Sequence, residues 1–248
     1  MIGDGATLFS HFAFPPNHLG YCGPADTGLI GELIVAGEDG LEEMRHVIPD
    51  FDGAWPYLEL IAACGGRDPL DPEVVEAYWL GSPLLERTDM LLMGNSIEER
   101  FRRRAGHDWD AVTAGLSSGA RPNHSFHVFC IYPWVGLLKS GMVDPALQVL
   151  DRCRIRWGVV KGSVDSKVLV RSRSLQWDGR SIGLGPEMVE SVSPAVDAVP
   201  LEPGELVAMH WDYVCQRITR GQLGQLEHYH NLHLGIVNGS ASQLASRF

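Results

Sequence analysis

The sequence reads Lys167-Val-Leu-Val-Arg-Ser-Arg-Ser-Leu-Gln-Trp177 and then, after Asp178-Gly179, Ser181-Ile-Gly-Leu184. The first run contains residues typical of strands, and Asp-Gly is a favoured sequence for the tight turn of an antiparallel pair. These residues therefore predict a β-hairpin. Short apolar and β-branched runs on both sides extend the prediction to a small antiparallel β region, over about residues 155–209.

The chain before this region contains start and stop signals typical of a series of helices. Asp71-Pro72, Ser82-Pro83 and Asp144-Pro145 are typical helix starts, and Gly81 is a typical helix end. We expect a helical region over residues 1–154, the β region over 155–209 and a C-terminal helical return over 210–248, integrated in one domain. Because helices and strands are segregated along the chain, the fold class is α+β.

Composition and charge argue against some classes of protein, such as nucleic-acid-binding and membrane-spanning proteins. The 248 residues are 45% hydrophobic, which is enough for a sizeable core, and the net charge of −11 argues against a nucleic-acid partner. No apolar run reaches the roughly 20 residues of a membrane span. The five cysteines form no C-x-x-C pair and the first residues lack the basic region of a signal peptide, so we expect a cytoplasmic protein.

One apolar run carries three groups that are costly to bury without partners, namely His124, His127 and Cys130. A helix places the two histidines on one face. Histidine and cysteine are good ligands for zinc, iron or nickel, so these residues are candidate metal ligands. The alternative is structural, with both imidazoles bonded to backbone carbonyls and the thiol packed as a small apolar group.

A second cluster follows the β region. His210, Asp212 and Cys215 are predicted to lie at the end of a strand and the start of a helix. His210 and Cys215 are further candidate metal ligands. Asp212 is expected either to cap the helix or to orient an imidazole.

A third candidate is Cys22. Pro24 is expected to open a helix, and a thiol at a helix N-terminus has a lowered pKa. The segment Asn17-His-Leu-Gly-Tyr-Cys-Gly-Pro24 resembles the nucleophile segment of papain-like and bacteriocin-processing cysteine peptidases. That resemblance implies a Cys22 nucleophile, with His124 or His127 as the base and His18 or Asn17 near the oxyanion site.

Basic residues concentrate between positions 100 and 180, whereas acidic residues dominate before position 100. Arg154 and Arg156 alternate with apolar residues and lead into the β region. Arginine suits the binding of carboxylate or phosphate, so these two are candidate cofactor-binding residues. The alternative is a buried arginine–carboxylate network that joins the helices to the β region.

Taken together, several blocks resemble an uncharacterised actinobacterial family whose members accompany genes for nickel–iron hydrogenases. The blocks are residues 12–24, 53–61, 75–79, 124–128, 132–138, 149–158 and 209–215. The resemblance implies an accessory protein in metalloenzyme maturation or assembly, with a metalloenzyme subunit as partner, and the family supplies no catalytic residues to carry over. A homo-oligomer is compatible with the sequence, and a purely structural or binding module is the remaining hypothesis.

Overall fold

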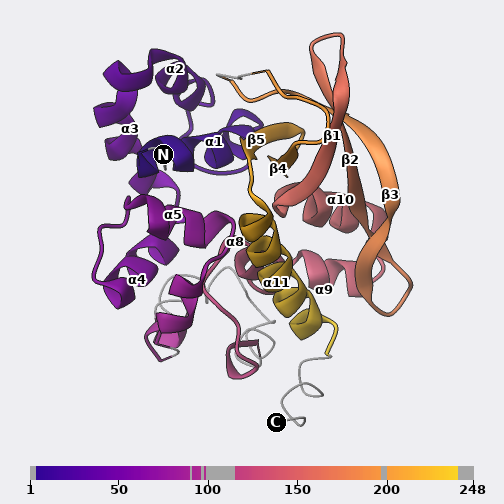
Figure 1. Cartoon of the computed structure of the whole chain (residues 1–248). Coiled ribbons are helices and arrows are strands. Elements are labelled where there is room, and N and C mark those ends of the chain that lie inside the picture. Colours follow the sequence, from indigo (N-terminus) through magenta and orange to yellow (C-terminus); the bar gives the residue numbers. More distant parts are fainter. Residues whose placement is uncertain (1–3, 90, 96–97, 99–114, 197–199, 240–248) are drawn as a thin grey trace.

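The computed structural model describes residues 4–89, 91–95, 98, 115–196 and 200–239. Helices make up the part of the chain before the β region, and an antiparallel sheet with a C-terminal helix makes up the rest, so the α+β class is confirmed. Figure 1 shows the N-terminal helices on one side of the molecule and the long strands on the other. Within the described residues, no helix is both long and apolar enough to cross a membrane.

The N-terminal half is built around the first helix, α1, which contacts α2, α3 and α5. Its elements are α1 (Gly5–His18), α2 (Leu29–Ala36), η1 (Gly37–Gly40), α3 (Leu41–Val47), η2 (Ile48–Asp50), α4 (Trp55–Gly65), α5 (Pro72–Trp79) and η3 (Pro83–Arg87). Helix α5 begins as predicted, because the Asp71 side chain accepts a hydrogen bond from the Glu73 amide and Pro72 occupies the first turn.

The middle of the chain contains the histidine-rich segment and is helical, as expected. Helix α8 (His124–Phe126) continues directly into a π-helical turn, η5 (His127–Ile131), and α9 (Trp134–Lys139) and α10 (Val143–Cys153) follow. The wider π turn closes with a hydrogen bond of 3.1 Å from the Tyr132 amide to the His127 carbonyl. Such turns are rare and are frequent at functional sites.

In the described part of the chain, five antiparallel strands form one sheet in the order β3-β2-β1-β4-β5. They are β1 (Arg156–Val164), β2 (Lys167–Trp177), β3 (Ile182–Val192), β4 (Leu206–His210) and β5 (Tyr213–Arg217). The predicted hairpin joins β2 to β3, and the Asp178 side chain accepts hydrogen bonds from the amides of Arg180 and Ser181 inside the turn.

The sheet curls until its two edge strands meet. Just after β3, the Ser193 amide donates to the Asp212 carbonyl at 2.7 Å, and the Val214 amide of β5 donates to the Ser193 carbonyl at 2.9 Å. Inside the curl, apolar side chains from all five strands pack together: Val160, Val168, Val170, Val192, Val207, Met209 and Val214. The contact covers part of each edge, where backbone groups would otherwise lie open.

Two sequence-based expectations about helix starts are wrong. The C-terminal helix α11 (Arg220–Val237) begins at Arg220 and not at His210, because the chain first makes a two-residue turn and adds β5. Its start is a capping box formed by Thr219 and Gln222. Pro24 does not open a helix either, since α2 begins at Leu29.

A continuous core joins the two parts of the fold. The largest cluster of buried apolar side chains contains Phe12 and Trp79 from the helices together with Ala208 and Cys215 from β4 and β5. Helix α1 contacts both of these strands, and α10 contacts β2. This packing brings the ends of α1, α5, α10 and β4 close to the start of α8.

Candidate functional site

A cavity of about 320 Å³ lies where these elements meet. Seven aromatic side chains line it, together with prolines, small residues and the candidate groups Cys22, His124, His127, Cys153 and His210. The aromatic residues are Tyr21, Phe51, Tyr78, Trp79, Tyr132, Trp134 and Trp211. Four of the residues singled out in the sequence therefore share one cavity.

His124 is 6% exposed and both of its ring nitrogens face polar partners. Its Nε2 lies 2.8 Å from the Cys153 carbonyl oxygen, which can only accept, so Nε2 carries the proton. Its Nδ1 lies 3.2 Å from the Tyr78 hydroxyl, which is also 3.2 Å from the Gly53 carbonyl. In this tautomer Nδ1 accepts from the Tyr78 hydroxyl. In the other tautomer, Nδ1–H would donate to the Tyr78 oxygen while the Tyr78 hydroxyl donates to the Gly53 carbonyl.

His210 is held by a carbonyl that a proline leaves free. Its Nδ1 donates to the Phe12 carbonyl at 2.7 Å. In a regular helix that carbonyl would accept from residue 16, but residue 16 is a proline inside α1 and has no N–H. The sequence of α1 therefore fixes the orientation and the tautomer of an imidazole that lies almost two hundred residues further along the chain.

Within the described residues, no hydrogen-bond donor reaches the other nitrogen of His210. Nε2 is fully buried, and the proton on Nδ1 leaves it with a bare lone pair. The Cys153 carbonyl lies near both rings, but His210 Nε2 has no proton to donate, so that carbonyl is bonded by His124. A buried nitrogen without a partner is costly unless something else satisfies it.

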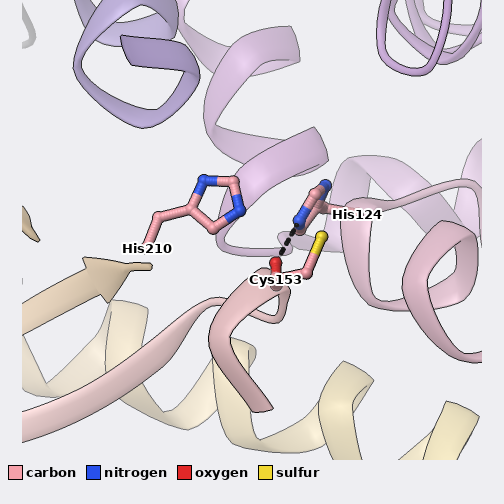
Figure 2. A group of neighbouring side chains, drawn as sticks. All are labelled: His124, Cys153 and His210. Carbon is pink, nitrogen blue, oxygen red and sulfur yellow. Dashed lines mark hydrogen bonds between the residues drawn. The ribbon is translucent and has the colours of Figure 1, made fainter. Parts of the chain in front are cut away.

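Cys153, at the C-terminus of α10, completes a group of three. One ligand atom from each of His124, Cys153 and His210 lies within 4.8 Å of the others. Figure 2 shows the two imidazoles pointing toward one another above Cys153. Around a tetrahedral zinc ion the ligand atoms lie about 3.5 Å apart, so small side-chain rotations bring this group to coordinating distance.

Burial sets the protonation of all three groups. It lowers the pKa of His124 to about 4 and that of His210 well below its usual value, with the neighbouring His124 adding to the effect. It raises the pKa of the Cys153 thiol. Both imidazoles are therefore neutral at pH 7, which is the form that binds a metal, and the thiol becomes a ligand when a metal displaces its proton.

His127 lies in the same cavity but outside the group of three. Its Nδ1 is 3.1 Å from the Tyr57 hydroxyl, and its ring lies edge-on against Tyr132. A side-chain carbon added at Gly53 would come within 3.2 Å of its Nε2, so the glycine leaves room for this ring. His127 therefore lies in the cavity wall beside the loop before α4.

The expected lowering of the Cys22 pKa is wrong. Without a helix beginning at Pro24, no helix dipole acts on this thiol, and burial raises its pKa to about 12. Asn17 does not lie ready as an oxyanion donor, because its side-chain amide donates to the carbonyls of Cys22 and Pro24. The geometry does not favour a thiolate nucleophile.

Three other candidates from the sequence do not line the cavity, namely Asp212, Cys215 and Cys130. Asp212 is exposed in the β4–β5 turn, where it forms an ion pair with Arg152 and caps no helix. Cys215 is a residue of β5 and its side chain is buried in the core. Cys130 is half-buried between two apolar clusters. Burial raises the pKa of both thiols.

Arg154 and Arg156 are both 1% exposed and form a buried network rather than a ligand site. Arg154 binds the Asp151 carboxylate at 2.9 Å and the Arg173 carbonyl. Arg156 binds Glu190 at 2.5 Å and the carbonyl of Trp211. These contacts do not support the expectation that the two guanidinium groups bind a cofactor. They support the alternative, a buried arginine–carboxylate network that joins α10 to the sheet.

A family model covers residues 1–244 of the chain. Its description is a family of unknown function, DUF6390. The chain belongs to this family. Comparison with curated proteins and with solved structures found no match. The resemblance to an uncharacterised family is thus confirmed, while the actinobacterial origin and the link to hydrogenase genes stay predictions.

Two residues of the site in this DUF6390 member, Cys153 and Tyr78, were not predicted from the sequence. Cys153 lies between two arginines, and the signal that could have pointed to it is its position at the end of the predicted helical region. Tyr78 was visible only as part of an apolar helix. Their contacts with His124 and His210 arise from tertiary packing, which no spacing in the sequence records.

Proposed function

We propose that the protein binds one transition-metal ion through His124, Cys153 and His210. The observation that carries the proposal is the His210 ring, whose Nδ1 is fixed by the Phe12 carbonyl while no donor among the described residues reaches the buried Nε2. A metal-binding histidine usually donates its other N–H to a carbonyl or carboxylate, which fixes the tautomer in the same way.

The ligand set favours zinc or a similar borderline ion. Two neutral imidazoles and a thiolate are three of the four ligands of a tetrahedral zinc site, and sites that bind further molecules keep the fourth position open. Tyr78 makes coordination by His124 Nε2 feasible, because the His124 proton can move to Nδ1 and donate to the Tyr78 oxygen while Tyr78 donates to Gly53.

The cavity beside the three residues favours a handling or catalytic role for the metal over a purely structural one. Structural zinc sites are closed by four protein ligands, whereas this group borders a space large enough for a small molecule. Metal binding next to a cavity is the function that this geometry supports best.

Metal analysis of protein purified without a histidine tag tests the proposal. We expect about one zinc or cobalt ion per chain after loading, and at least a 100-fold loss of affinity in Cys153→Ser and His210→Ala. Cys130→Ser is the matched control, because it removes a half-buried thiol from outside the group of three. Equal affinities in Cys153→Ser, Cys130→Ser and the unaltered protein, all folded, would rule the site out.

A role in metalloenzyme assembly is the narrower form of this proposal. It adds a partner, the immature subunit of a metalloenzyme, and the family resemblance supports it together with the acidic first hundred residues, which suit a basic partner surface. The test is transfer of bound metal to an apo hydrogenase subunit in the presence of a chelator. Transfer no faster from the loaded protein than from free metal would remove this role and leave metal binding intact.

A further inference from the structure

The described residues that line the cavity beside the candidate metal group include no Asp, Glu, Lys or Arg. Burial keeps the imidazoles of His124 and His210 neutral. A charged ligand would lose its hydration without finding an opposite charge, which is costly. The wall therefore selects for an uncharged molecule.

The aromatic side chains that line the cavity favour a ligand with planar aromatic rings. Phe51, Tyr78, Trp79, Tyr132 and Trp134 present aromatic surfaces, and the exposed Tyr21 ring stacks on Trp211 with 4.1 Å between centroids. Aromatic rings pack against other rings in offset or edge-on contacts worth about 0.5–1.5 kcal/mol beyond burial. A cavity of about 150 Å³ holds benzene, so a volume of about 320 Å³ has room for two fused rings.

The three protein ligands would leave one position of a tetrahedral metal for a further donor. We infer that the cavity binds a small, uncharged, planar aromatic molecule whose single nitrogen or oxygen donor takes that position. This inference rests on the proposed metal site. A cationic ligand, which aromatic walls can also attract, is disfavoured because two neutral imidazoles and one thiolate leave a divalent metal with a net positive charge.

Isoquinoline and naphthalene provide a matched pair of probes, since both are two fused rings and only isoquinoline has a donor nitrogen. We expect isoquinoline to bind the cobalt-loaded protein at least 10-fold more tightly than naphthalene and to change the visible spectrum of the cobalt. We expect isoquinoline to lose this advantage in the metal-free protein. Protonated or quaternised amines should bind at least 10-fold more weakly than isoquinoline.

A variant of α10 tests whether the probe occupies this cavity. Val149 lines the cavity on a half-exposed face of the helix, so Val149→Trp fills it without altering a candidate ligand. We expect isoquinoline affinity to fall at least 10-fold in this variant, with cobalt affinity unchanged. Gln148→Trp, at an exposed position outside the cavity, is the control and should change neither.

The outcomes separate this inference from the proposed function. If the protein without isoquinoline does not bind cobalt, the proposed metal site is wrong, and the inferred ligand that binds through the metal is wrong with it. Normal cobalt binding overturns only the ligand inference if isoquinoline and naphthalene bind equally, if a cationic amine binds best, or if Val149→Trp leaves isoquinoline affinity unchanged.

Discussion

Pro16 shows how one residue can prepare a site in a distant part of the chain. It interrupts the hydrogen bonding of α1, and the Phe12 carbonyl released by this interruption orients His210. Prolines inside helices are usually destabilising, so a buried pair at positions 15 and 16 calls for a compensating contact. The bond to His210 supplies that contact for the second proline.

Pro16→Ala should weaken metal binding. The new N–H at position 16 competes with His210 Nδ1 for the Phe12 carbonyl, so the imidazole loses its fixed tautomer. Removing such a supporting contact typically costs about 10- to 100-fold in metal affinity. Cobalt titration measures the effect, and Pro15→Ala is the control because its new N–H faces the His11 carbonyl instead. Unchanged affinity in Pro16→Ala would contradict this account of His210.

Tyr78→Phe tests the corresponding contact of His124. The variant removes the hydroxyl that lies 3.2 Å from His124 Nδ1, and we expect metal affinity to fall about 10- to 100-fold. Tyr57→Phe is the matched control, because its hydroxyl contacts His127, outside the group of three. If both tyrosine variants lowered the affinity equally, the effect would come from general loosening of the cavity and not from His124.

At the scale of elements, tertiary hydrogen bonds hold the β4–β5 turn in an unfavourable backbone conformation. Trp211 adopts a positive φ of 52°, which is unfavourable for a residue with a side chain. Its amide donates to the Arg152 carbonyl at 2.8 Å, and its carbonyl accepts from the buried Arg156. The arginine network thus fixes the backbone that carries His210 and the Trp211 wall of the cavity.

Arg156→Met should destabilise the fold by about 3–5 kcal/mol, because Glu190 and the Trp211 carbonyl lose a buried cation. Arg156→Met/Glu190→Met should recover part of this loss, since no unpaired charge stays buried. Urea unfolding gives both values. Arg171→Met is the surface control, where the ion pair with Glu187 is exposed and about 1 kcal/mol or less is expected. A loss below about 1 kcal/mol for Arg156→Met would contradict the structural role.

The sequence predicts those elements whose signals are local. The Asp178-Gly179 hairpin, the Asp71 cap and the helical character of the His124 segment all depend on a few neighbouring residues, and the structure has all three. Strand β5 was predicted as helix because Tyr213-Val-Cys215 is short and its turn contains no glycine. Trp211 takes the positive φ there through tertiary contacts that a local pattern does not encode.

The candidate site was predictable only in part for the same reason. Isolated histidines in apolar runs are conspicuous, so His124 and His210 could be paired in advance as metal candidates. Which thiol joins them depends on where α10 ends relative to α8, and the structure selects Cys153 over Cys130 and Cys215. The direction of the Cys22 pKa shift depended on a helix that does not form.

For the whole molecule, buried neutral histidines predict a loss of stability in acid. Burial lowers the pKa of His233 to about 3, and burial together with Arg154 lowers that of His230 well below 6.5. Each ring binds a proton only in the unfolded chain as pH falls below 6.5, so its contribution is complete above that value and decreases toward acid. Each should remove about 1.4 kcal/mol per pH unit there.

Urea unfolding at pH 7, 6 and 5 measures this dependence, and uptake of at least two protons on unfolding is expected at pH 5. His233 accepts a hydrogen bond at Nε2 from the Arg121 amide, so its neutral form is required by the fold. A free energy of unfolding that is constant from pH 7 to pH 5 would contradict the prediction.

The distribution of the candidate ligands along the chain has a consequence for biosynthesis. His124, Cys153 and His210 belong to the start of α8, the end of α10 and the end of β4. The ribosome synthesises them in that order, and Phe12 of α1, whose carbonyl orients His210, is synthesised before all three. A nascent chain therefore has no complete group of three until residue 210 has been synthesised, so the group can form only after β4 has joined the sheet.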